Sequence, residues 1–227
     1  MKSGATNGTL AETLRDRMRD DILGGHLLPG ERLTFAKLGK RYDVGIGVAR
    51  EALTWLAGRG LVTTVAHHGY QVTPLTHDGL EQLVAARMLI EPAVLAESVG
   101  RGDVDWEGRV LSSHHVLSRT PAPAEGSDVD AGWAVAHAVF HEALLSGCEN
   151  PRLLAIVRGI EEESSLYRWW ATADSTYRER EQAEHLALRE LALARDADRA
   201  AAALREHIAH VRDARHDLLT DSRVPEA

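Results

Sequence analysis

Residues 29–72 read PGERLTFAKLGKRYDVGIGVAREALTWLAGRGLVTTVAHHGYQV, and this stretch decides the fold. A short helix is predicted to begin after Thr34, because threonine is a residue type that caps helix N-termini. A turn at residues 42–44 follows. A second helix is predicted over about residues 46–59, since apolar side chains recur in it at helical spacing until Gly60 stops it.

Two β-rich pieces come next, residues 61–65 and 70–73, joined by Ala-His-His-Gly, and they predict a hairpin. Helix, tight turn, helix and hairpin is the pattern of a winged helix-turn-helix. In that fold the second helix can lie in a DNA major groove, while the hairpin tip reaches the backbone or the minor groove. The alternative is a small helical module of the same shape that binds protein.

Outward from this stretch, the rest of the chain is predicted to be helical. Leu10, Leu14, Met18 and Ile22 recur every four positions, which predicts an amphipathic helix that packs behind the other two. From Asp78 on, the chain is rich in Ala and Leu and shows no strand pattern. Six helices are predicted there, over about residues 78–99, 104–118, 128–146, 151–173, 176–195 and 197–219.

The predicted fold class is therefore mainly α, in two domains. Residues 1–75 form the winged helix-turn-helix, and residues 78–222 form an all-helical bundle that suits a ligand cavity between facing helices. A length of 227 residues leaves enough core material for both domains.

The charge is distributed unevenly between the two parts. The whole chain has a net charge of −8, which is unusual for a DNA-binding protein. Residues 1–75 hold 10 Lys and Arg against 7 Asp and Glu, a net charge of +3, whereas residues 76–227 hold 16 against 27, a net charge of −11. The positive charge thus coincides with the helix-turn-helix, where phosphate contacts need it.

Several protein classes are excluded by composition. No run of about 18 apolar residues occurs, so no membrane span is expected. The N-terminus lacks an apolar signal region, and a cytoplasmic protein is expected. Cys148 is the single cysteine, so no internal disulfide can form.

The N-terminal part resembles the DNA-binding domain of GntR-family bacterial transcription regulators. The resemblance is carried by an ordered set of residues: Ile22, Gly25, Pro29-Gly30, Leu33, Leu38, Val44, Arg50-Glu51-Ala52-Leu53, Leu56, Gly60-Leu61-Val62 and Gly69. It implies that Arg50 contacts DNA and that His68 enters the minor groove, although a plain exposed turn histidine is an equal alternative for His68. The predicted DNA-binding residues are Thr34, Lys37, Lys40, Arg41, Ile46, Gly47, Arg50, His68 and Gly69.

Two details of this set come from the residues themselves. Lys37, Lys40 and Arg41 form a basic cluster near the turn, which favours phosphate contact over a merely solvated helix face. The family usually has Ser or Thr and then Arg after the valine matched by Val44, whereas this chain has Gly45-Ile46. Gly45 is a weaker N-cap, and Ile46 is predicted to contact a thymine methyl group or no base at all.

The C-terminal part resembles the FCD domain, the all-helical effector domain of FadR-type GntR regulators. The matching features are Arg87-x3-Glu91, Phe140-His141, Asn150-Pro151, Glu184-His185 and His207. The resemblance implies a homodimer with its contacts in the helical domain, a metal site, and DNA-binding heads that reorient when an effector binds.

The spacing of four histidines predicts where that metal binds. His137 and His141 are four residues apart and share one helix face. His185 and His207 each lie eleven residues from Asp196, near which the chain turns, so an antiparallel hairpin places them side by side. Family members usually have Asp at the position of His137. Four imidazoles favour zinc or nickel and leave a charge of +2, which predicts a small carboxylate effector with Arg87 as a second anchor.

We therefore expect a ligand-responsive regulator, not an enzyme, that binds a short inverted-repeat operator as a homodimer and acts as a repressor. One alternative is a metal-dependent enzyme that uses the same histidines. Another is a regulator whose bundle only dimerises. Residues 161–163 are interpreted as a solvated acidic face, and His114, His115 and His210 as surface residues.

Overall fold

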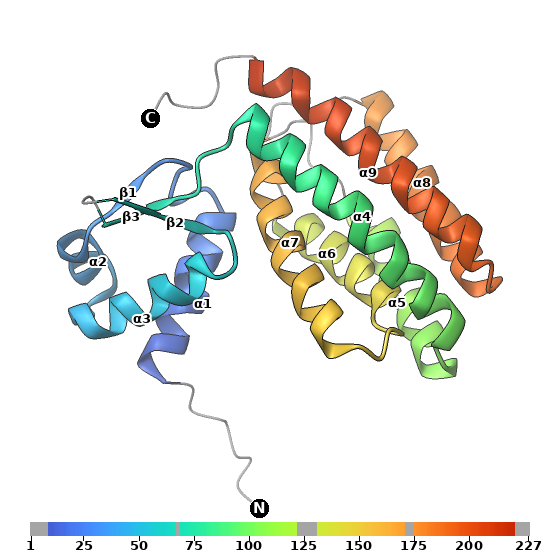
Figure 1. Cartoon of the computed structure of the whole chain (residues 1–227), viewed down its shortest axis with the longest axis horizontal. Helices are drawn as coiled ribbons and strands as arrows, with labels where there is room; N and C mark the ends of the chain where they lie inside the picture. The colour runs from blue at the N-terminus through green and yellow to red at the C-terminus, as the bar shows by residue number, and fades with distance from the viewer. Residues whose placement is uncertain (1–8, 67–68, 122–130, 171–174, 221–227) are drawn as a thin grey trace, which may run out of the picture. The chain divides into compact units, whose positions relative to one another are not determined.

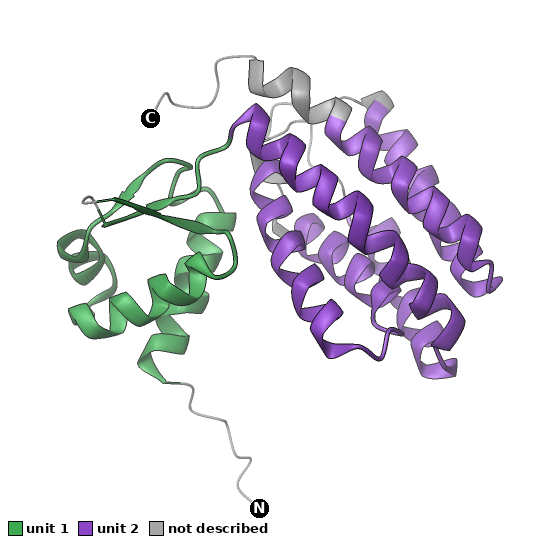
Figure 2. Ribbon diagram, in the orientation of Figure 1, with its two compact units in different colours: residues 1–75, 225–227 green, residues 76–224 purple. Residues whose placement is uncertain are grey.

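The computed structural model describes residues 9–66, 69–121, 131–170 and 175–220. The chain divides between Leu75 and Thr76 into two compact units, coloured green and purple in Figure 2, which we call unit 1 and unit 2. Each unit has its own hydrophobic core. The predicted fold class is confirmed, because a small three-stranded sheet with helices is followed by a part that is entirely helical.

Unit 1 is a winged helix-turn-helix (Figure 1). Its elements are α1 (Leu10–Leu23), β1 (Arg32–Leu33), α2 (Phe35–Tyr42), α3 (Ile46–Ala57), β2 (Val62–Val65) and β3 (Gly69–Val72). The antiparallel sheet has the order β1-β3-β2. The strand β1 was not predicted, because two residues are too short to show an alternating pattern.

The ends of the unit 1 helices follow from their capping residues. Thr9 and Glu12 form a capping box at the start of α1, and the Thr34 hydroxyl accepts from the Lys37 N–H at 3.2 Å at the start of α2. Regular α3 geometry ends at Ala57, slightly before the predicted end. The N–H of Gly60 then bonds to the Ala57 carbonyl and that of Leu61 to the Leu56 carbonyl, a Schellman motif with Gly60 at φ +72°.

The core of unit 1 forms where α1 and α2 pack on α3. Leu14, Met18 and Ile22 of α1 are at most 2% exposed, and Leu53 and Leu56 of α3 are fully buried. The α1 residues are positions of the predicted four-residue period, and the α3 residues belong to the predicted apolar face of that helix. Burial of an apolar side chain stabilises by roughly 1.5–3 kcal/mol, so this shared core holds α3 in place.

Unit 2 contains the predicted set of six helices in its described part (Figure 1). They are α4 (His77–Arg101), α5 (Val104–Arg119), α6 (Ala131–Leu145), α7 (Pro151–Trp170), α8 (Ser175–Leu193) and α9 (Ala197–Thr220). Helix α4 packs most extensively against α9, while α6 packs against α5 and α8 packs against α9. The bundle core contains large side chains that are fully buried, among them Trp106 and Phe140.

The turn between α8 and α9 is a Schellman motif without glycine. The N–H of Asp196 bonds to the Leu191 carbonyl at 3.1 Å, and that of Arg195 to the Ala192 carbonyl at 3.2 Å. Arg195 has φ +61°, a conformation that glycine usually fills. Its guanidinium compensates, because it donates to the Val99 carbonyl and to Glu107 and lies 5.0 Å from the Trp106 ring centroid.

A buried ion network joins α4 to α7. Arg87, 2% exposed, donates to Glu91 at 2.6 and 3.1 Å, to Glu161 at 2.5 Å and to the Ser164 hydroxyl at 2.9 Å. Burial raises the pKa of Glu91 to about 7, and although Arg87 opposes this shift, Glu161 adds to it. The interpretation of residues 161–163 as a solvated face is therefore wrong for Glu161, which binds a buried cation.

Replacement of Arg87 by methionine should destabilise unit 2 by about 3–5 kcal/mol, because it leaves Glu91 buried without its cation. The loss should be smaller at pH 5 than at pH 8. Burial and Glu161 raise the pKa of Glu91, and Arg87 limits the rise to about 7. Without Arg87 that pKa rises further, so Glu91 is protonated in both proteins at pH 5, whereas at pH 8 only the variant bears the cost of a buried carboxyl group without a cation. Urea unfolding followed by circular dichroism at both pH values measures the two losses.

The matched control is Arg101→Met, at the end of the same helix. Arg101 pairs with Glu97 and Glu149, but its side chain is 56% exposed, so its loss should cost less than about 1 kcal/mol. Equal effects of the two substitutions, or no pH dependence for Arg87→Met, would contradict this account of the network.

Candidate metal centre and nucleic-acid interface

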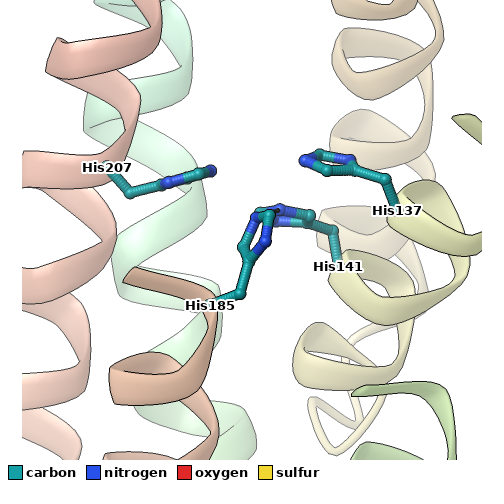
Figure 3. Close-up of side chains that lie close together, drawn as sticks. All are labelled: His137, His141, His185 and His207. Carbon is teal, nitrogen blue, oxygen red and sulfur yellow. Dashed lines mark hydrogen bonds between the residues drawn. The ribbon is translucent and has the colours of Figure 1, made fainter. Parts of the chain in front are cut away.

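Four histidine side chains converge in the middle of unit 2. His137 and His141 come from α6, His185 from α8 and His207 from α9, and Figure 3 shows their rings turned toward a common centre. Each of them is at most 3% exposed. Buried polar groups of this kind need polar partners or a metal ion to replace the water that they have lost.

The distances between the rings fit one shared ion. One potential ligand atom from each histidine lies within 4.8 Å of all the others, and the Nε2 atoms of His141 and His185 are 3.3 Å apart. Two ligands that each lie about 2.0–2.2 Å from one ion are roughly 3–4 Å apart in tetrahedral or octahedral geometry. The cluster is thus one that could hold a metal ion.

The local structure explains why these residues meet. The four-residue spacing puts His137 and His141 on one face of α6. The turn at residues 194–196 sets α8 and α9 antiparallel, so that His185 and His207 face each other at a ring-centroid distance of 4.9 Å. Phe140, fully buried, lies edge-on to His141 and His185 and keeps this side of the cluster dry.

Glu184 orients one of the four imidazoles. One of its carboxylate oxygens lies 2.8 Å from Nδ1 of His207 and the other 2.5 Å from Nδ1 of His210. A carboxylate only accepts, so His207 must carry its proton on Nδ1 and has Nε2 left as its ligand atom. Burial raises the pKa of Glu184, but the hydrogen bonds from His207 and His210 outweigh it and hold that pKa below its usual value.

A pocket of about 310 Å³ adjoins the cluster. His185 belongs both to the cluster and to the lining of this pocket. Its lining comes from α5, α6 and α8 and consists of His114, Leu117, Ser118, Trp133, Arg178, Glu181, Gln182, His185 and Leu186. This volume suits a small molecule of a few heavy atoms.

Two further sequence-based interpretations concern this region. His114 was interpreted as a surface residue, which is wrong: it is 7% exposed, packs edge-on against Phe140 and borders the pocket. Arg87 is absent from the described residues that line the pocket, and its guanidinium is bonded to Glu91, Glu161 and Ser164. Its role as an effector anchor stays a prediction, and it would require the effector to replace one of these partners.

Sequence reasoning did not assign a role to Glu184 or to Glu181. Glu181 is 6% exposed, and its Oε1 lies 3.7 Å from Nε2 of His137. In the sequence, Glu184 is marked only by its place in the matched pair Glu184-His185, and Glu181 only by its spacing of four residues from His185, which is common on solvated helices.

The predicted phosphate-binding cluster in unit 1 is partly engaged within the unit. Lys37 pairs with Glu31 at 2.7 Å, and Arg41 donates to Asp21 on α1 at 2.9 and 3.2 Å. The Tyr42 hydroxyl donates to the same Asp21 oxygen at 2.6 Å. Both basic side chains are still 38–50% exposed, so each can also reach a phosphate.

The first turns of α3 present the predicted base-reading residues. Ile46 is 59% exposed, Gly47 has no other atom within 4 Å of the point where a Cβ would lie, and Gly45 makes no side-chain cap. Arg50 is exposed, with its guanidinium 5.5 Å from the centroid of the Phe35 ring. Gly69 has φ +84°, as the turn of the hairpin requires, and His68 lies outside the described residues.

Comparison with known proteins defines the class. Residues 10–72 match the model for bacterial regulatory proteins of the gntR family, and residues 82–210 match the FCD domain. A winged helix-turn-helix joined to an FCD domain defines a DNA-binding transcription regulator. The chain belongs to the GntR family, as the resemblance of its sequence implied.

Relatives of known name agree with this class. Over 202 residues the chain is 38% identical to BphR of Paraburkholderia xenovorans, named an HTH-type transcriptional regulator, with 88% of this chain and 82% of the relative covered. Over 195 residues it is 31% identical to GlaR of Escherichia coli, named an HTH-type transcriptional repressor, with 84% and 89% covered.

Solved structures share the fold over nearly the whole chain. A GntR transcriptional regulator from a Rhodococcus species aligns with a TM-score of 0.72 and 20% identity, over 95% of this chain and all of that one. McbR/YncC of Escherichia coli also aligns with a TM-score of 0.72, at 16% identity, over 94% and 98% of the two chains. Among the helices that the structure describes, none has the length and apolar character of a membrane span.

The contact between Glu184 and His207 makes a prediction about the metal-free protein. At pH 8 with a chelator present, neutral His207 should be the Nδ1–H tautomer, and Glu184→Ala should move it toward the Nε2–H form. Long-range ¹H–¹⁵N NMR distinguishes the two forms. The control is Glu190→Ala, at an exposed position of the same helix, which should leave the tautomer of His207 as in the wild type. If Glu184→Ala also leaves the His207 tautomer as in the wild type, the assignment is wrong.

Proposed function

We propose that the protein is a repressor whose unit 1 binds an operator and whose unit 2 senses a small carboxylate through a divalent metal. The observation that carries the proposal is the convergence of four buried imidazoles beside a pocket of about 310 Å³. A purely structural core would hardly gather four polar rings there, because each buried polar group costs free energy unless it is satisfied.

The metal is zinc or nickel, held by His137, His141, His185 and His207. Imidazole nitrogen is a preferred ligand of both ions. When bound, such an ion supplies a Lewis-acidic centre with room for an oxygen ligand from the effector. His207 is set for this role, because Glu184 holds its other nitrogen.

The effector is a small carboxylate that enters through the pocket. The pocket ends at His185, and Arg178 in its lining supplies a positive charge that attracts an anion. Arg87 is a second proposed anchor, reached only if the effector carboxylate replaces Glu161 or Glu91 on its guanidinium. A bound effector then changes how the DNA-binding units are oriented.

Unit 1 binds DNA through α3 in the major groove. Exposed Ile46, Gly47 and Arg50 support base contacts, while Lys40 and its basic neighbours on α2 support phosphate contacts. One helix reads only a few bases, so we propose that a homodimer binds a short inverted repeat. The proposed location is the cytoplasm. The repressor role is supported by the name of the relative GlaR.

Metal content tests the sensor. Protein purified without added metal should contain about one zinc or nickel ion per chain, measured by elemental analysis, and chelation should lower its melting temperature, because a ligand that binds only the folded state stabilises it. His185→Ala should lose the metal and, with it, the response of operator binding to added carboxylates.

His115→Ala is the matched control, since His115 is an exposed histidine on α5 and should leave the metal content unchanged. A metal-free protein whose operator binding still responds to carboxylates would contradict the sensor proposal. Turnover of those carboxylates by the metal-loaded protein would instead favour a metal-dependent enzyme.

Substitutions in α2 and α3 test DNA binding. On an operator selected from random DNA, Arg50→Ala should weaken binding by about 1–3 kcal/mol through loss of a base contact. Lys40→Ala should weaken all sequences nearly equally and reduce the salt slope by about 1, because it removes a phosphate contact. Fluorescence anisotropy across a salt series gives both quantities.

Arg152→Ala, an exposed arginine on α7 of unit 2, should bind DNA like the wild type. The measured stoichiometry should be two chains per operator. Wild-type affinity in both unit 1 variants would refute the proposed docking, and a stoichiometry of one would refute the homodimer.

A further inference from the structure

Glu181 lies where the histidine cluster meets the pocket. It is 6% exposed, its Oε1 is 3.7 Å from Nε2 of His137, and it belongs to the pocket lining. It precedes His185 by one helical turn on α8, so both side chains project from the same face of that helix. A carboxylate oxygen thus lies beside the imidazole of His137 and next to the pocket that Glu181 shares with His185.

The distance from Glu181 to His137 suits a second ligand of an ion that His137 binds. Ligands about 2.0–2.2 Å from one metal lie roughly 3–4 Å apart, and 3.7 Å falls within this range, as does the 3.3 Å between the nitrogens of His141 and His185. A buried carboxylate is costly unless a positive charge compensates it. An ion at the histidines would supply that charge within reach of Glu181.

The nearby Glu184 has a different place in the site. Both of its oxygens are taken by Nδ1 atoms, one of His207 and one of His210, and Arg180 donates to it as well. It acts on the cluster only through His207. Glu181 instead lies beside His137 and lines the pocket.

We propose that Glu181 supplies the carboxylate of the metal centre and occupies the coordination position that the effector carboxylate takes. The inference rests on the proposed metal sensor. On exchange, the bond between the Glu181 oxygen and the metal breaks and a bond to an effector oxygen forms. One carboxylate replaces another, so the charge at the metal is unchanged and no proton is transferred. Glu181 is then an internal competitor that sets the threshold for the effector.

Glu181→Gln keeps the shape of the side chain and removes its charge, so it should lower the affinity for zinc and raise the affinity for acetate. Zinc affinity, measured by competition with a chromophoric chelator, should fall about 10–100-fold. Acetate affinity of the cobalt-loaded protein, read from the visible absorption of Co²⁺, should rise on the order of tenfold, because the competing side chain no longer occupies the position.

Two variants on the same helix serve as controls. Glu179→Gln removes the same charge from an exposed position and should change neither affinity. Glu184→Ala should weaken zinc about 10–100-fold, because His207 loses its orienting partner, but should not strengthen acetate binding. The rise in acetate affinity is therefore specific to a residue that competes for the open position.

The outcomes separate this inference from the sensor proposal. A wild-type protein that binds no metal overturns both. Metal binding in the wild type with unchanged zinc and acetate affinities in Glu181→Gln overturns the role of Glu181 alone. Weaker zinc binding with unchanged acetate affinity overturns the exchange. If Glu181→Gln does not fold, Glu181→Asp takes its place: its shorter carboxylate should weaken zinc and strengthen acetate binding, and wild-type values would overturn the inference.

Discussion

The turn at residues 194–196 is the constraint on which the centre of unit 2 depends. Two backbone hydrogen bonds close it, and Arg195 takes a left-handed conformation that a non-glycine residue adopts only when its surroundings hold it there. Those surroundings are the Val99 carbonyl, Glu107 and the Trp106 ring. Because α4 and α5 thereby hold this turn, they also set the register that brings His185 opposite His207.

Unit 2 holds two buried polar centres of different character. Around Arg87, one guanidinium meets two carboxylates and a hydroxyl, so donors and acceptors are matched within the protein and the network joins α4 to α7. Around the histidines, four buried rings point toward one another beside a pocket. The first centre is balanced by charges within the protein, whereas the proposed metal ion would add a cation to the second.

Unit 1 has a well-packed helical core, and the start of α3, where we propose base contacts, is poor in polar side chains. The core of α1 and α3 and the Asp21 contacts to Arg41 and Tyr42 place α3 rigidly. Burial raises the pKa of Asp21, but the hydrogen bonds from Tyr42 and Arg41 outweigh it, so the carboxylate stays ionised and keeps α1 joined to α2. At the start of α3, where we propose base contacts, Gly45 and exposed Ile46 offer no polar side chain, so the proposed docking would rely more on apolar contact and DNA shape.

The sequence by itself determined the winged helix-turn-helix, the six helices of unit 2 and the family, because apolar periodicity, capping residues and turn glycines are local signals. The pairing of His137 with His141 and of His185 with His207 follows from regular helical spacing and one short turn, whereas the meeting of the two pairs depends on how α6 packs in the bundle. Only the tertiary structure decided which partners the charged side chains have. Glu161, Glu181 and Glu184 read alike on a helix, yet one binds a buried arginine, one borders the pocket and one orients His207. Their roles depend on which helix packs against each of them, and no local pattern records that.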